Sequence, residues 1–170
     1  MARPDLPLAL VELALHRLPS FVGPRLVTAG LRLSGARVPS STVFFGMPTL
    51  SGPGDVASRL QIGELCGFNF GCHFELYAPI TIADHVAVGH EVLFLTRTRD
   101  PKDPARRGAA DGAKPIVVEA GAWLGSRCTV LPGVTIGAGS VVGASVVVRE
   151  NVPPNTLLAG ARRISIAKWR

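Results

Sequence analysis

Large apolar residues recur at every sixth position through most of the chain from residue 38 onward. They are Val38, Phe44, Leu50, Val56, Ile62, Phe68 and Phe74, then, after a two-residue slip near Tyr77, Ile82, Val88 and Phe94, and finally Val118, Leu124, Val130, Ile136, Val142 and Val148. A second inward position, four residues on, holds small or apolar side chains: Cys66, Cys72, Val86, Val92, Cys128, Val134 and Val146. A period of six does not fit the 3.6-residue period of an α-helix, but it is three times the strand period of two. The pattern therefore predicts short strands joined by tight turns.

Three such strands would form one turn of a coil, about 18 residues long, with the large residues pointing inward. Glycine often follows the large residue, as at Gly63, Gly125 and Gly137. We expect these glycines to adopt the positive φ that a sharp corner demands. The cysteines occupy the second inward position, so they are predicted to be core residues rather than metal ligands or nucleophiles: Cys66, Cys72 and Cys128.

Two apolar segments precede the repeat, and Pro19 and Pro24 separate them. They predict two amphipathic helices within an N-terminal region of residues 1–37. We expect these helices to cap one end of the coil. Nearby arginines also leave open a weak contact with a membrane surface: Arg17, Arg25 and Arg32.

The repeat region is predicted to span residues 38–160, with a basic tail over residues 161–170. A polar segment rich in proline and glycine interrupts the repeat at residues 97–114 and is too long for a simple corner. Loops extruded from a rigid scaffold often carry function, so this segment is a candidate for the functional site. A prism of stacked coils also leaves flat outer faces and open ends, and we therefore expect self-association.

Composition narrows the choice of function. The 170 residues are 47% hydrophobic and 18% charged, which indicates one folded domain and excludes disorder. The net charge of +6 is modest, and no basic run alternates with aromatic residues, so we expect a phosphate-bearing small molecule rather than a nucleic acid. Three cysteines without metal-ligand spacing favour a reducing cytoplasm over a disulfide scaffold or a zinc site. No stretch approaches the ~18 apolar residues that span a bilayer.

The later repeats resemble a known family. The segments Ile116–Ser126, Leu131–Gly137 and Val152–Gly160 are similar to those of hexapeptide-repeat acyltransferases, above all the galactoside, maltose and exopolysaccharide O-acetyltransferases. The resemblance, which covers residues 38–160, implies an all-β fold: a left-handed parallel β-helix with an N-terminal α-helical segment. It also implies a homotrimer, acetyl-coenzyme A as acyl donor in a groove between subunits, no metal, and an acceptor hydroxyl on a sugar, glycan precursor or natural product.

The catalytic histidine of that family has no counterpart at the matching position. The family's segment of the Thr-x-Thr-His-Asp-Pro type corresponds to residues 95–104, and Arg99 stands where the histidine is expected. An arginine, with a pKa above about 12, cannot accept the proton of a hydroxyl near neutral pH. The resemblance thus makes Arg99, Asp100 and His90 the candidate catalytic residues.

Three interpretations stay open at this point. Another group can act as the base: His90 is the nearest histidine in sequence, Asp100 adjoins the position, and His73 and His85 lie on earlier coils. The chain can instead be a non-catalytic coenzyme A-binding or partner subunit. Alternatively, Arg99 holds an anionic substrate or polarises a carbonyl. A metal-dependent hydratase of the carbonic-anhydrase type, known on this fold, would need three converging histidines, and those present lack the expected spacing.

The resemblance also assigns binding residues. Asn69 matches an asparagine that contacts the acceptor sugar, although a turn role fits it equally well, and Thr98 lies beside Arg99 on the acceptor side. The candidates on the donor side are Ser126, Ala144, Arg149, Arg163 (or Arg162), Lys114 and Trp123. Arg149 is one residue out of the family's register. Trp123 and Lys114 also have structural interpretations, as packing against the 97–114 loop and as its closure.

Overall fold

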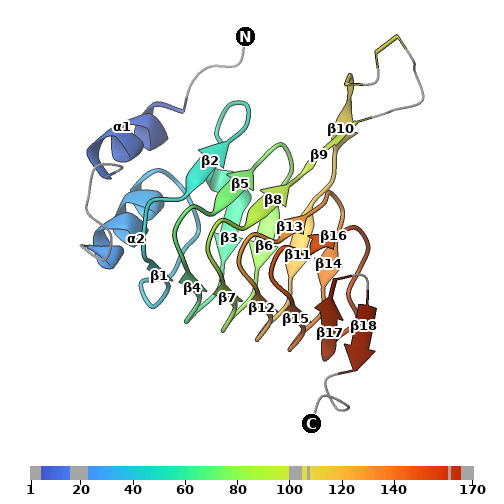
Figure 1. Cartoon of the computed structure of the whole chain (residues 1–170). Helices are drawn as coiled ribbons and strands as arrows, with labels where there is room; N and C mark the ends of the chain where they lie inside the picture. The colour runs from blue at the N-terminus through green and yellow to red at the C-terminus, as the bar shows by residue number, and fades with distance from the viewer. Residues whose placement is uncertain (1–4, 16–22, 100–104, 107, 161, 166–170) are drawn as a thin grey trace.

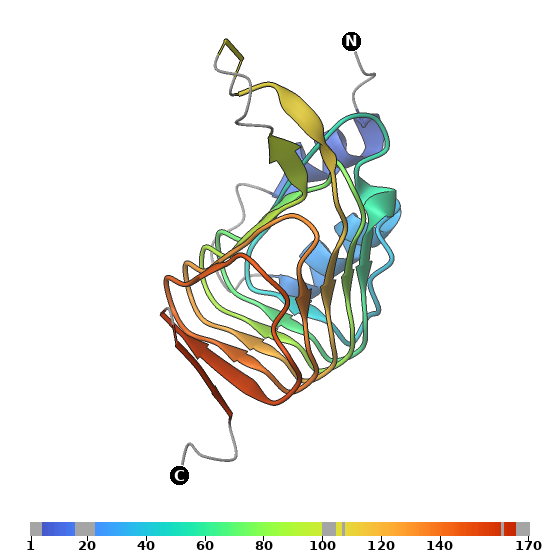
Figure 2. The ribbon, with the colours of Figure 1, turned by 90° about the vertical axis from the view of Figure 1, so that its right-hand side faces the viewer.

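The computed structural model describes residues 5–15, 23–99, 105–106, 108–160 and 162–165. Its main body is a coil of short parallel strands with helices at the N-terminal end, and an arm projects from one corner (Figure 1). Seen from the C-terminal end, the coils stack in register around a common interior (Figure 2). The predicted parallel β-helix with an N-terminal helical segment is confirmed.

Among the described residues, three parallel sheets form the sides of the coil. Sheet A contains β3 (Leu60–Ile62), β6 (Ile80–Ile82), β11 (Ile116–Val118) and β14 (Thr135–Ile136). Sheet B contains β1 (Val43–Phe44), β4 (Gly67–Phe68), β7 (Ala87–Val88), β12 (Trp123–Leu124), β15 (Val141–Val142) and β17 (Thr156–Ala159), with β18 (Arg162–Ser165) antiparallel at its edge. Sheet C contains β2 (Thr49–Ser51), β5 (His73–Glu75), β8 (Leu93–Leu95), β13 (Thr129–Val130) and β16 (Val147–Val148). The chain passes from A to B to C in each coil.

The interior is filled by the residues that the six-residue period selects. Every large residue of the series is buried, as are the three cysteines and the other residues of the second inward set. The rings of Phe44 and Phe68 stack with centroids 4.5 Å apart, and those of Phe74 and Phe94 stack at 4.8 Å. Successive coils therefore add aromatic contacts to their backbone hydrogen bonds.

The coil is longer in its first turns than the predicted 18 residues. Paired residues are 24 apart between β1 and β4, 20 apart between β4 and β7, and 18 apart between β12 and β15. The first coil accommodates the 3₁₀ helix η1 (Ala57–Arg59), so the buried Val56 fills an extra inward position rather than a strand position. The period of six holds, but four units instead of three complete that coil.

The expectation for the corner glycines was wrong. Those that follow a large inward residue do not have positive φ; instead, a Cβ added to Gly125 would lie 2.6 Å from the backbone nitrogen of Ala144 in the next coil. Glycine is needed there because adjacent coils approach closely. Positive φ occurs two residues further on, mostly at residues other than glycine: Leu65, His85, Glu91, Arg127 and Ser145.

The helices α1 (Leu6–Leu15) and α2 (Pro24–Leu33) lie at the N-terminal end of the coil (Figure 1). Asp5 joins α1 to the first coil. One of its carboxylate oxygens accepts a hydrogen bond from the N–H of Leu8 at 3.1 Å, and the other accepts from Val56 at 3.1 Å and Ala57 at 3.4 Å. One side chain thus satisfies N–H groups at the starts of both α1 and η1.

The segment that interrupts the repeat forms an arm. Its strands β9 (Arg97–Arg99) and β10 (Ala110–Ala113) pair antiparallel. The arm leaves the coil between β8 of sheet C and β11 of sheet A, and it projects well beyond the prism (Figures 1 and 2). The described ends of the segment that interrupts the repeat are thus two paired strands outside the sheets of the coil.

Candidate functional site

Several predicted binding residues line one corner of the coil, where the chain turns from sheet B to sheet C. Asn69, His90, Ser126 and Ala144 follow β4, β7, β12 and β15, so each stands on a successive coil. Residues that are up to 75 positions apart in the sequence thus lie along one edge of the coil. We call this row the B–C corner.

Direct contacts join the central members of the B–C corner. The backbone N–H of His90 donates to Ser126 Oγ at 3.1 Å, and the His90 side chain is exposed with its ring 5.8 Å from that of Phe70. The half-buried Asn69 donates from Nδ2 to the carbonyl of Val88 at 3.1 Å. Its amide oxygen and second N–H keep their capacity for a ligand. An imidazole, a carboxamide and a hydroxyl therefore share one edge.

An ion pair follows this row. The exposed Arg127 donates from Nε to Glu91 Oε2 at 2.7 Å, joining the residues that come directly after Ser126 and His90. The hydrogen bond from the Arg127 guanidinium and its charge lower the pKa of the Glu91 carboxyl. Because both side chains are exposed, solvent screens the pair and it contributes little to stability.

The arm residues occupy a different corner, between sheets C and A. Arg99 donates from Nη1 to the carbonyl of Gly108 at 2.6 Å, so its guanidinium ties the two sides of the arm. Thr98 is half-buried and pairs with Gly112 in the neighbouring strand. Asp100 lies outside the described residues. Within one protomer, the Arg99 corner and the B–C corner are separated by the width of sheet C.

The base of the arm contains a contact that the sequence did not suggest. The Arg97 guanidinium lies over the Tyr77 ring, 4.7 Å from its centroid, and donates to the phenol oxygen at 3.3 Å. The backbone N–H of Arg97 also donates to Glu75 Oε2 at 3.0 Å. The break in the six-residue series near Tyr77 was the only available signal, because it marks where the coil changes to admit the arm. This contact fixes the direction in which β9 leaves the coil.

The remaining donor-side candidates lie outside the B–C corner, on sheet B, on β18 and beside the C–A corner. Trp123 points outward from β12 in sheet B and is 51% exposed, flanked by Ala87 and Val141 in the paired strands. Lys114 and Arg149 are exposed beside the C–A corner, where the Lys114 N–H donates to the carbonyl of Thr96. The backbone of Arg163 lies in β18, and its side chain is outside the described residues.

His73 and His85 do not join His90. His73 lies on sheet C with Nε2 2.7 Å from Ser51 Oγ, and His85 lies at the A–B corner with a φ of 59°. No group of three His, Cys, Asp or Glu side chains suited to a metal ion is found within the described ranges. Burial raises the pKa of the Cys72 thiol to about 11 and that of Cys128 to about 12, which makes both poor nucleophiles.

Comparisons with known proteins agree with this architecture. Residues 115–150 match the family described as bacterial transferase hexapeptide (six repeats). The repeats and the coil give the chain the parallel β-helix architecture of hexapeptide-repeat proteins. It is similar to acetyltransferases of this kind in both sequence and structure, as the following relatives show.

The galactoside O-acetyltransferase of Escherichia coli is 33% identical over 103 residues, covering 61% of this chain and 51% of that protein. A Schizosaccharomyces pombe protein, whose acetyltransferase name is itself provisional, is 38% identical over 114 residues, covering 67% and 55%. A hexapeptide-repeat acetyltransferase of Vibrio cholerae, solved with acetyl-coenzyme A, is 27% identical with a TM-score of 0.72, covering 94% of this chain and 84% of that one.

The chain spans about half the length of the curated relatives it matches. Within the described residues, no helix is both long and apolar enough to cross a membrane.

Proposed function

We propose that this chain is an acetyl-coenzyme A-dependent O-acetyltransferase whose acceptor is a hydroxyl of a sugar, a glycan precursor or a natural product. The observation that carries the proposal is the B–C corner, where Asn69, His90 and Ser126 stand on successive coils of a scaffold shared with acetyltransferases. The Vibrio cholerae relative binds acetyl-coenzyme A, and the Escherichia coli relative is named for acetylating galactosides. The three buried free thiols suit a reducing cytoplasm.

A homotrimer would complete the site. The B–C corner carries Ser126 and Ala144, whereas Arg99, Lys114 and Arg149 stand at or beyond the C–A corner. In a ring of three prisms, the C–A corner and arm of one protomer would face the B–C corner of its neighbour. The donor would then lie in the intersubunit groove, with Ser126 and Ala144 beside its pantetheine arm. The cationic side chains, together with Arg163 and the indole of Trp123, would flank its phosphate-bearing part.

His90 is the base that this geometry supports best. Its ring is exposed at the row that carries Ser126, so a neutral imidazole there can reach a hydroxyl brought to the donor. In the transfer step, the acceptor oxygen attacks the thioester carbonyl as its proton passes to His90. Collapse of the tetrahedral adduct then expels the coenzyme thiolate, which recovers that proton. Asn69 would bind the acceptor through its free amide groups.

Arg99 has a different task in this proposal. Its hydrogen bond to the Gly108 carbonyl holds the arm, and the other N–H groups of the guanidinium would donate to an acceptor or to the developing oxyanion. Thr98 and Asp100 would stand beside it on the acceptor side. A non-catalytic coenzyme A-binding subunit is the second candidate, favoured by the arginine at this position.

The decisive experiment measures coenzyme A release from acetyl-coenzyme A with a panel of sugars and other hydroxylated acceptors. We expect transfer by the wild-type protein and a fall in kcat of about 100-fold or more in His90→Gln, because general base catalysis contributes that much. His85→Asn is the matched control, since asparagine tolerates the positive φ of that exposed histidine.

Two results would contradict the proposal in different ways. Unchanged kcat in His90→Gln would remove His90 as the base while leaving the activity intact. Binding of acetyl-coenzyme A without transfer to any acceptor would instead favour the non-catalytic subunit. Sedimentation equilibrium of the same preparation tests the trimer, and a monomer at the assay concentration would exclude a shared site.

A further inference from the structure

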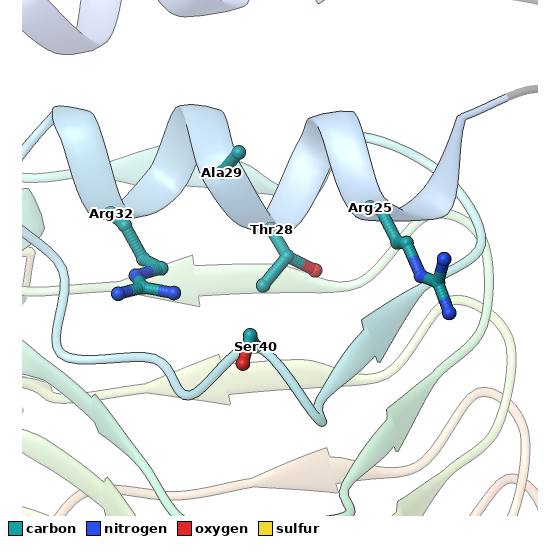
Figure 3. A pocket seen from close by; sticks show the side chains of 5 residues that line it. All are labelled: Arg25, Thr28, Ala29, Arg32 and Ser40. Atoms are coloured by element: carbon teal, nitrogen blue, oxygen red, sulfur yellow. The ribbon is translucent and has the colours of Figure 1, made fainter.

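A hollow of about 300 Å³ lies at the N-terminal end of the coil, far from the B–C corner. It is lined by Arg25, Thr28, Ala29 and Arg32 of α2 and by Ser40 of the loop that leads into β1 (Figure 3). Ser40 stands at the A–B corner of the first coil, because Arg37 bridges to sheet A before the loop and β1 enters sheet B after it. The hollow is thus bounded by a helix on one side and by the first turn of the coil on the other.

The lining of this hollow is positively charged. Arg25 and Arg32 are seven residues apart on α2, so they stand on the same side of the helix with a separation of about 10.5 Å along its axis. The described residues offer neither arginine a carboxylate partner, and no acidic side chain is among the residues that line the hollow. Two guanidinium groups that are always ionised therefore face the same space without compensation.

The backbone around the hollow is fixed by buried contacts. The Thr28 hydroxyl lies 3.1 Å from the carbonyl of Pro24 and 2.9 Å from that of Thr42, which ties α2 to the loop opposite. Thr28 itself is only 3% exposed. Ala29 has too small a side chain to fill the space between the arginines. The spacing of the two arginine backbones is therefore set by a packed helix rather than by a loop.

We propose that this hollow binds a compact ligand with two adjacent phosphate groups, such as a diphosphate ester. Each arginine would donate to one phosphate, a geometry that suits the planar guanidinium, and the Ser40 hydroxyl would donate between them. A single phosphate would engage both cations less well because of their separation. The diphosphate can belong to a soluble ester or to the headgroup of a lipid-linked diphosphate.

The test uses the full chain and isothermal titration with inorganic pyrophosphate at low ionic strength. We expect pyrophosphate to bind more tightly than orthophosphate, and the double variant Arg25→Gln/Arg32→Gln to weaken pyrophosphate binding at least about tenfold. Arg37→Gln is the matched control, because this exposed arginine is on the same end of the coil but outside the lining. Equal pyrophosphate affinity in the double variant and the wild type, with both folded by circular dichroism, would overturn the proposal.

A competition titration distinguishes binding in this hollow from binding at the donor site, since coenzyme A also carries a diphosphate. Pyrophosphate affinity should be unchanged in saturating coenzyme A, and displacement would assign the binding to the donor site and reject the hollow. Flotation with phosphatidylcholine vesicles, with and without an isoprenyl diphosphate, then distinguishes the two sources. If the protein floats with the diphosphate-containing vesicles and the double arginine variant does not, the ligand is a lipid headgroup. If pyrophosphate binds in the titration but the protein does not float with these vesicles, the ligand is a soluble ester. Wild-type protein that binds neither would refute the site.

Discussion

Asp5 is predicted to hold the N-terminal helices against the coil. Its carboxylate is the N-terminal cap of α1 and also accepts two N–H groups at the start of η1, 51 and 52 residues away. Loss of a cap costs about 1 kcal/mol, and the η1 contacts at 3.1 and 3.4 Å add about 0.5–1.5 kcal/mol for a half-exposed group. Asp5→Ala should therefore destabilise the docking of α1 by about 2 kcal/mol.

Hydrogen–deuterium exchange measured by mass spectrometry can test this value peptide by peptide. A loss of about 2 kcal/mol corresponds to roughly 30-fold faster exchange in residues 6–15, while peptides from β12 to β16 keep their protection. Asp55→Ala is the matched control, because the Asp55 carboxylate accepts a local hydrogen bond from Ser58, and within the described residues no hydrogen bond joins it to α1. Unchanged exchange in α1 of the Asp5 variant would refute the reasoning, since the helix would then be held by its apolar contacts alone.

Three further predictions concern the coil and the arm. Gly125→Ala should lower the free energy of unfolding by about 1–3 kcal/mol in thermal melts, because its Cβ would meet backbone 2.6 Å away, whereas Gly67→Ala, with no atom within 4 Å, should be nearly neutral. Burial and, to a smaller extent, the nearby Cys72 thiol raise the pKa of the Cys128 thiol to about 12. The contribution of this thiol to the free energy of unfolding is therefore full below about pH 8.5 and is lost as pH rises toward 12. In urea unfolding, the free energy of unfolding of Cys128→Val should fall less steeply with alkaline pH than that of the wild type. Tyr77→Leu should loosen the arm by about 0.5–1 kcal/mol and speed its cleavage by trypsin about two- to fivefold, and unchanged cleavage would exclude the contact with Arg97 as an anchor.

The coil could be predicted from the sequence because its physical cause is local and repeated. A six-residue period places one large residue in the interior of each side, and every member of the series is buried. The extra unit at Val56 could not be predicted, because Val56 fits the six-residue series although the chain there forms the 3₁₀ helix η1 instead of a strand. The role of the corner glycines was misjudged for a related reason. Glycine is required because adjacent coils approach closely, as at Gly125 against the backbone of Ala144. The sequence of a single strand and turn does not show this approach.

The candidate site was predictable only in parts, and the reason lies in the topology. The family resemblance could assign Asn69, Ser126 and Arg99 one by one. The hydrogen bond between His90 and Ser126 could not be predicted in that way, because it forms only when β7 and β12, 36 residues apart in sequence, pair as neighbours. The same topology puts sheet C between that row and Arg99. A site that uses both corners, as we propose, would need two copies of the chain, and a single sequence does not display that juxtaposition.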